Sequence, residues 1–208
     1  MPHQILTSAK SAMLKEYKDH VEERLQQGIP PLPLNAEQVA DLVELLKSPP
    51  AGEEEFILDL IKNRTPAGVD PAAYVKAAFL TALAKGETSS PLIDKKLATE
   101  LLGTMLGGYN VESLIKLLKD EEVGAIAADG LSKTLLMFNS KHEVIELAAE
   151  NENAKRVVES WSNGEWFTSK SKLPEVIKAI VFRVDGEINT DDFSPAQDAP
   201  SRPDIPLH

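Results

Sequence analysis

The 208-residue chain contains no cysteine. This absence excludes disulfides, a thiolate nucleophile and a zinc ion held by thiolates. It also excludes the usual ligation of an iron–sulfur cluster by cysteines of this chain. Only four histidines are present, and they are too scattered to predict a metal site. The residues of this chain therefore predict neither a metal nor another cofactor.

Positive charge and long apolar runs are also scarce. The chain has 22 Lys and Arg against 33 Asp and Glu, a net charge of −11, and an acidic surface repels phosphate backbones. This balance argues against nucleic acid as a partner. No apolar run approaches the roughly 20 residues that span a bilayer, and the first residues lack the apolar stretch of a signal peptide. We expect a soluble cytoplasmic protein with no membrane partner.

Helical patterns extend from about residue 5 to residue 160. Apolar residues recur there at spacings of three and four, which is typical of amphipathic helices. Capping residues precede the apolar stretches, and two of them have the spacing of a capping box. The predicted caps are Asn35 with Gln38, Asp70 before Pro71, Asn110, and Ser140 with Glu143.

The lengths and spacing of these helices predict the fold class. Helices of about 10–17 residues, paired at intervals of roughly 35–40 residues, favour stacked antiparallel pairs. We therefore expect a mainly α protein with a HEAT-like α-α superhelix. An irregular helical bundle is the alternative, because no strong residue-level repeat is visible. The first helix is expected over residues 9–27, and an alanine-rich one over residues 122–138.

Several local features have simple structural explanations. Residues 28–34, GIPPLPL, favour a rigid linker over a polyproline ligand. The three glutamates Glu53, Glu54 and Glu55 suit the first turn of a helix, where negative charge is favourable. A catalytic role for them is disfavoured, because adjacent helical residues point in different directions.

The composition changes after Ser160. Trp161, Trp166 and Phe167 cluster there, which favours a packed seam at the end of the helical unit and leaves a ligand-stacking site as the alternative. Residues 176–184 are β-branched and apolar on both faces, and predict a buried strand closed by a turn. An irregular coil is expected from Asn189 onward.

One loop concentrates carboxylate and hydroxyl side chains, which are groups that bind ligands or take part in catalysis. Asp191, Asp192 and Ser194 follow the predicted strand within the stretch GEINTDDFSPA, and loops at strand ends commonly carry function. An ordinary turn with side-chain-to-backbone hydrogen bonds is the alternative. Arg202 lies eight residues beyond Ser194 between rigid segments, where a guanidinium is suited to bidentate binding of a carboxylate.

The same loop resembles a known family. Its Thr-Asp pair before Ser-Pro-Ala is similar to the swivel-domain pattern of aconitases, and residues 186–208 resemble the aconitase B family in particular. Upstream, the segments AEQVADLVELLKSPPAGEEEF, GVDPAAYVKAAFL and LLGTMLGGYNVESLI resemble the N-terminal helical domain of that family. The resemblance divides the chain into an N-terminal extension (1–12), a HEAT-like helical domain (13–160) and a partial swivel domain (161–208).

The resemblance also implies a function. Intact members of the family are hydro-lyases that interconvert citrate and isocitrate through cis-aconitate, an activity of the tricarboxylic acid cycle, and act through a [4Fe-4S] cluster held by domains beyond His208. This chain would supply scaffold, a dimeric association surface in the helical domain and part of the substrate site. Arg202 matches a family arginine that binds a substrate carboxylate; Asp191, Asp192 and Ser194 match the motif loop without an assigned catalytic role.

The resemblance further implies that this chain is not catalytic alone. The sequence stops within the swivel pattern, which favours a cut chain over a natural short protein. A free-standing helical-repeat module that binds proteins is the alternative. A third class, RNA binding, is disfavoured by the negative charge.

Overall fold

The computed structural model describes residues 2–28, 31–68, 70–105, 108–134, 137, 140–169, 172–180, 186 and 189, and it describes side chains from residue 12 onward. The chain is mainly helical, and the described residues contain no strand. Ten helices are described: α1 (Pro2–Gln26), α2 (Ala36–Lys47), α3 (Glu54–Asn63), α4 (Pro71–Ala84), α5 (Lys95–Gly103), α6 (Val111–Leu117), α7 (Gly124–Lys133), α8 (Lys141–Leu147), α9 (Glu152–Asn163) and α10 (Glu165–Thr168).

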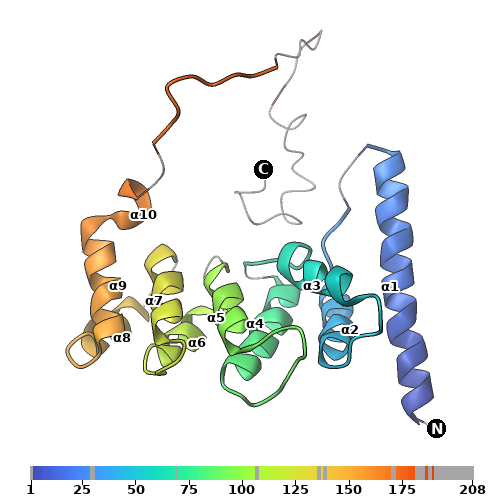
Figure 1. Cartoon of the computed structure of the whole chain (residues 1–208), viewed down its shortest axis with the longest axis horizontal. Helices are drawn as coiled ribbons and strands as arrows, with labels where there is room; N and C mark the ends of the chain where they lie inside the picture. Colours follow the sequence, from blue (N-terminus) through green and yellow to red (C-terminus); the bar gives the residue numbers. More distant parts are fainter. Residues whose placement is uncertain are drawn as a thin grey trace.

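The helices stand side by side in a row, with α1 at one end and α9 and α10 at the other (Figure 1). Helices α2, α4, α5, α7 and α9 form a continuous line, because each packs against the next. Helix α3 packs against α2, α6 against α7, and α8 against α9. The core therefore runs along the row rather than lying at a single centre.

Four helices begin at a residue whose side chain accepts a hydrogen bond from the first turn. Asn35 and Gln38 form the predicted capping box of α2, and Asp70 accepts from the Ala72 amide before α4. Asp94 and Asn151 cap α5 and α9 in the same way. Extended backbone at these cap residues points the side-chain oxygen at the free amides.

The predicted caps at Asn110 and Ser140 are wrong. Neither side chain accepts a capping hydrogen bond, and both residues have helical backbone angles instead of the extended ones that a cap requires. The buried side-chain amide of Asn110 instead donates to the carbonyl oxygens of Leu102 (2.8 Å), in the last turn of α5, and Met105 (3.2 Å), just after it. Asn110 thus satisfies carbonyls at the end of one helix rather than amides at the start of the next.

Two helix lengths also differ from the sequence prediction. Helix α1 begins at Pro2 rather than near residue 9, and α7 ends at Lys133 rather than near residue 138. Thr134 leaves the helical conformation with ψ at 110°, while its hydroxyl donates to the Gly130 carbonyl. This side-chain hydrogen bond satisfies one of the free carbonyls at the end of α7.

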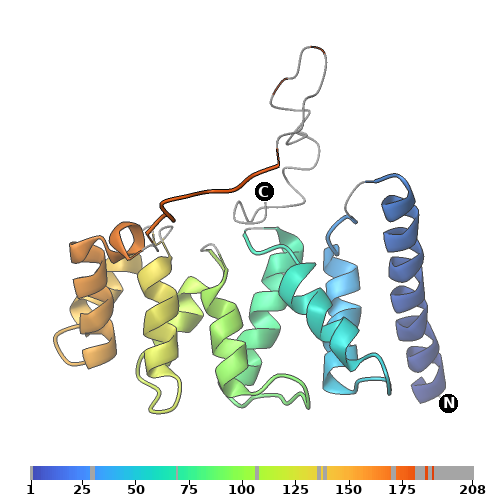
Figure 2. The same ribbon diagram turned by 45° about the horizontal axis from the view of Figure 1, so that its top comes forward.

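The predicted buried strand is wrong for its described part, residues 176–180. This segment leaves α10 as an extended chain apart from the helices (Figure 2). Val176, Ile177 and Ile180 are 69–83% exposed. A strand requires a neighbouring strand for its backbone hydrogen bonds, and the described residues offer none to this segment. Residues 181–185 lie outside the described residues.

Helices α5 and α7 cross at two glycines, Gly103 and Gly130. A Cβ atom on Gly130 would lie 2.7 Å from the Cα of Gly103, and one on Gly103 would lie 3.0 Å from the Cα of Gly130. Both distances are shorter than an ordinary carbon–carbon contact. The two backbones therefore touch at this point of the row, and no larger residue fits without separating them.

Candidate functional site

The residues singled out from the sequence as the candidate site are Asp191, Asp192, Ser194 and Arg202. All four lie outside the described residues, so their predicted roles remain predictions. The described residues offer only surfaces and junctions of the helical row for comparison. Three of them are the α1–α3 junction, the aromatic pocket beside α9 and an ion-pair network between α5 and α7.

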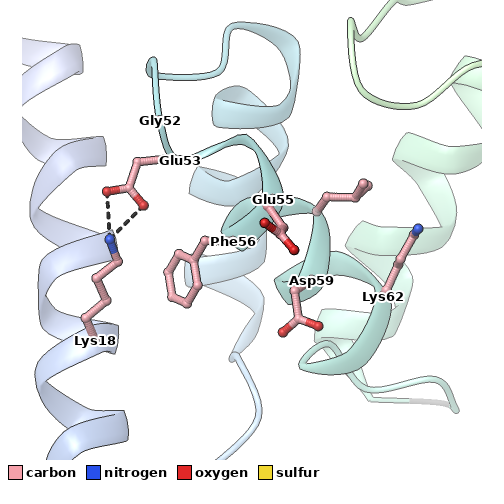
Figure 3. A pocket seen from close by; sticks show the side chains of 8 residues that line it. Lys18, Gly52, Glu53, Glu55, Phe56, Asp59 and Lys62 are labelled. Carbon is pink, nitrogen blue, oxygen red and sulfur yellow. Dashed lines mark hydrogen bonds and ion pairs between the residues drawn. The ribbon is translucent and has the colours of Figure 1, made fainter.

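A groove of about 730 Å³ separates α1 from α3. The Lys18 ammonium reaches across from α1 and donates to both carboxylate oxygens of Glu53 at 2.6 Å (Figure 3). The same ammonium lies 4.8 Å from the centre of the Phe56 ring, within the range of a cation–π contact. Glu55, Asp59 and Lys62 also line the groove.

Two of the three consecutive glutamates at the start of α3 have structural contacts. Glu53 pairs with Lys18, and Glu54 accepts a hydrogen bond of 2.7 Å from the Gly52 amide just before α3. Glu55 lies on a different side of the helix from Glu53 (Figure 3). Glu53 and Glu55 point in different directions (Figure 3), and Glu54 is bound to a backbone amide, which agrees with the interpretation of these residues as a helix start.

Helix α1 is also hydrogen-bonded to the linker that follows it, residues 28–34. The Tyr17 hydroxyl donates to the Leu32 carbonyl at 2.8 Å, and the Leu32 amide donates to Nε2 of His20 at 3.0 Å. Two residues further on, the Leu34 amide donates to the Arg64 carbonyl at 2.8 Å. The described end of the linker, at Leu32 and Leu34, is thus held by α1 and by the residue after α3, which agrees with its interpretation as a rigid connection.

The surroundings of Tyr17 keep its hydroxyl protonated, so that it can donate the hydrogen bond to Leu32. Burial raises the pKa of the Tyr17 hydroxyl, the positive charge of Arg64 opposes that rise, and the negative charge of Asp59 adds to it. The phenol therefore stays protonated and remains a donor at neutral pH. Met13 and Leu14 are buried beside Tyr17, so apolar packing and the two hydrogen bonds act together to hold α1 against the row.

An aromatic pocket of about 230 Å³ lies at the other end of the row. Trp161 donates from its indole nitrogen to the Leu131 carbonyl at 3.1 Å, which ties α9 to α7. Trp166 and Phe167 meet edge to face with ring centres 5.0 Å apart, and Phe167 is 66% exposed. The predicted packed seam is therefore confirmed for Trp161, while Phe167 leaves an apolar surface open to solvent.

An ion-pair network joins the start of α5 to the turn before α7. The Lys95 ammonium donates to Asp120 at 2.8 Å and lies 3.6 Å from Glu122. Hydrogen bonding from Lys95 lowers the pKa of the Asp120 carboxyl, burial opposes this, and the backbone amides of Glu122 and Val123 lower it further. The same Asp120 hydrogen bond raises the pKa of Lys95.

This network predicts a pH-dependent contribution to stability. Because folding lowers the pKa of Asp120, its contribution is present above the ordinary aspartate range and is lost as the pH falls through the lowered value. We expect Asp120→Asn to destabilise the chain by less than about 1 kcal/mol at neutral pH, since the pair is partly exposed. The difference from wild type should disappear in acid. Thermal unfolding from neutral to acid pH measures it, with Asp19→Asn on α1 as the control.

No cluster of three or more His, Cys, Asp or Glu side chains that could hold a metal ion occurs among the described residues. None of the helices in the described part of the chain is both long and apolar enough to cross a bilayer.

Comparison with known proteins gives consistent matches along the chain. The family model described as "Aconitate B N-terminal domain" matches residues 16–167, and the model "Aconitate hydratase 2 N-terminus" matches residues 179–208. The chain is similar to proteins named "Aconitate hydratase B" from Pseudomonas aeruginosa (62% identity over 197 residues), Escherichia coli (60% over 197 residues) and Helicobacter pylori (49% over 197 residues). Each match covers 94% of this chain and 23% of the relative.

Proposed function

Because this chain belongs to the aconitase B family, we propose that it acts as the N-terminal part of an aconitate hydratase of that family. The observation that carries the proposal is the order of the two N-terminal family models, which match residues 16–167 and 179–208 in succession. The chain spans 23% of the length of its curated relatives. Interconversion of citrate and isocitrate is accordingly proposed for the complete enzyme.

The alternative function is that of a free-standing helical-repeat module that binds other proteins. Almost the whole chain, 94%, matches the relatives named as hydratases at 49–62% identity, and it covers 23% of their length. This match favours the N-terminal part of an aconitate hydratase over a separate binding module.

Within the complete enzyme, we assign residues 13–160 to a HEAT-like scaffold and residues 161–208 to the start of the swivel domain. Support for the scaffold comes from the row of helices in which each pair packs on the next. Support for the swivel domain comes from the second family model over residues 179–208. Arg202 is proposed to bind a substrate carboxylate there.

The [4Fe-4S] cluster implied by the family does not fit the residues of this chain. The sequence has no cysteine to supply thiolate ligands, and the described residues bring together no other metal-binding cluster. No step of the reaction is therefore assigned here to the cluster. The proposed contribution of this chain is to scaffold the enzyme, to associate with a second copy and to orient substrate.

Self-association through the helical domain is the part of the proposal that this chain can test alone. We expect a concentration-dependent dimer, because the family resemblance assigns association to the helical domain and two-fold pairing is the commonest closed arrangement. Since each chain carries a net charge of −11, association should strengthen as salt rises from low to moderate concentration. Sedimentation velocity over a protein and salt series measures this. A strict monomer at high protein concentration in moderate salt would contradict it.

A further inference from the structure

The aromatic pocket of about 230 Å³ lies at the end of the row, where α7, α8 and α10 pack around α9 (Figure 1). Trp161, Trp166 and Phe167 supply its rings, and the buried Met137 also lines it. Aromatic rings and a thioether are favourable neighbours for a further ring. Because a cavity of roughly 150 Å³ holds a benzene molecule, this pocket has room for one ring with a short substituent.

The pocket also contains a polar group without a partner. Ser160 on α9 lines the pocket and is only 5% exposed, and its hydroxyl forms no hydrogen bond with any residue that the structure describes. The hydroxyls of Ser132 and Thr134, which line the same pocket, instead donate to carbonyl oxygens of α7. A buried hydroxyl without a partner is unfavourable. An occupant with a hydrogen-bonding group therefore satisfies Ser160, whereas a purely apolar occupant does not.

Lys141, at the start of α8, adds a positive charge to the pocket. Its ammonium forms no ion pair within the described part of the chain, although the chain carries a net charge of −11. Lys95 and Lys116, by contrast, are paired with carboxylates. None of the described residues that line the pocket has a carboxylate. The charge of the pocket therefore favours an anionic occupant.

We propose that the aromatic pocket binds a small carboxylate that carries a single aromatic ring. The ring packs against Trp161, Trp166 and Phe167, and the carboxylate accepts hydrogen bonds from the Lys141 ammonium and the Ser160 hydroxyl. Such a ligand matches the volume, the rings, the buried hydroxyl and the charge together. The apolar segment that follows α10, residues 172–180, matches them less well, because it contains no aromatic ring and extends away from the helices (Figure 2).

Phenylacetate is a suitable probe, because it has one ring and a carboxylate on a short arm. Both tryptophans of the chain line the pocket, so tryptophan fluorescence reports on this site alone. We expect a saturable change in emission with a Kd on the order of 1 mM, as is usual for a ligand of about ten heavy atoms. Phenylacetamide, which is neutral and has the same shape, should bind at least about fivefold more weakly because it lacks the charge.

Substitutions in the pocket separate the contribution of charge from that of packing. Lys141→Ala should weaken phenylacetate binding by about fivefold or more and leave phenylacetamide binding unchanged, so that both probes bind alike. Ser160→Ala should weaken the binding of phenylacetate by roughly threefold or more, because one hydrogen bond is lost. Lys119→Ala makes the same change of charge in the turn after α6, away from the pocket, and should bind both probes like wild type. Circular dichroism checks that every variant is folded.

Three results would contradict the proposed site. The first is the absence of saturable phenylacetate binding by the wild type at tenfold the expected Kd. The second is equal affinity of the wild type for phenylacetate and phenylacetamide, or an unchanged affinity in Lys141→Ala. The third is binding that occurs only in Leu173→Asp/Ile177→Asp, which would show that residues 172–180 fill the pocket in solution. None of these results bears on the proposed role of the chain in an aconitate hydratase, which rests on the family matches.

Discussion

Replacing Arg202 by alanine in a complete aconitase B that contains this region is expected to lower kcat/KM by on the order of 10²- to 10³-fold. The physical reason is the loss of the proposed bidentate, charge-assisted hydrogen bond to a substrate carboxylate, which is worth about 3–4 kcal/mol in a desolvated site. Arg202→Lys should recover little of this loss, because an ammonium cannot reproduce the two parallel hydrogen bonds of a guanidinium. Added guanidinium ion should partly rescue the alanine variant and leave the lysine variant unchanged.

The matched control is Arg156→Ala in the same enzyme. Arg156 lies on α9 and pairs with Asp129 on the surface of the helical row, so its removal should change kcat/KM by less than about twofold. Steady-state kinetics with citrate and isocitrate separate effects on KM from effects on kcat. If Arg202→Ala retained wild-type kinetics, the role carried over from the family motif would be wrong for this chain.

Replacing Gly130 by valine is expected to destabilise the chain by about 3 kcal/mol or more. Even the Cβ atom would lie 2.7 Å from the Cα of Gly103, and a backbone atom cannot rotate away as a flexible side chain can. Helices α5 and α7 must therefore separate, which also opens gaps among the buried residues on either side. For a chain of this size, we expect the unfolding midpoint to fall by about 6–12 °C.

Ala125→Val provides the control for the Gly130 variant. Ala125 lies on the same helix at an exposed position, so valine there should cost less than about 1 kcal/mol, mainly through lower helix propensity. Differential scanning calorimetry of the three proteins compares the midpoints directly. Equal midpoints for Gly130→Val and the wild type would show that the two backbones do not meet at this crossing.

The helical class of the chain follows from the sequence. The three–four spacing of apolar residues and the caps at Asn35 and Asp70 specify α2 and α4 locally, and both caps are present in the structure. The family resemblance was also visible in short segments of sequence, and both family models agree with it. These features are decided by residues within a few positions of one another, so the sequence determines them without knowledge of long-range contacts.

Tertiary packing decided what the local pattern could not. Asn110 has the residue type of a cap but bonds to carbonyls near the end of α5. Gly130 lies inside α7 against the backbone of Gly103 on α5, a contact that no local pattern indicates. The strand predicted to begin at Val176 has the composition of a strand, yet residues 176–180 have no neighbouring strand among the described residues. Asn110 finds its acceptors five and eight residues away, in the preceding helix end, Gly130 meets a residue 27 positions away on another helix, and the segment 176–180 has no described neighbouring strand. Hydrogen bonds and close packing depend on which groups the fold brings together and not on residue type alone.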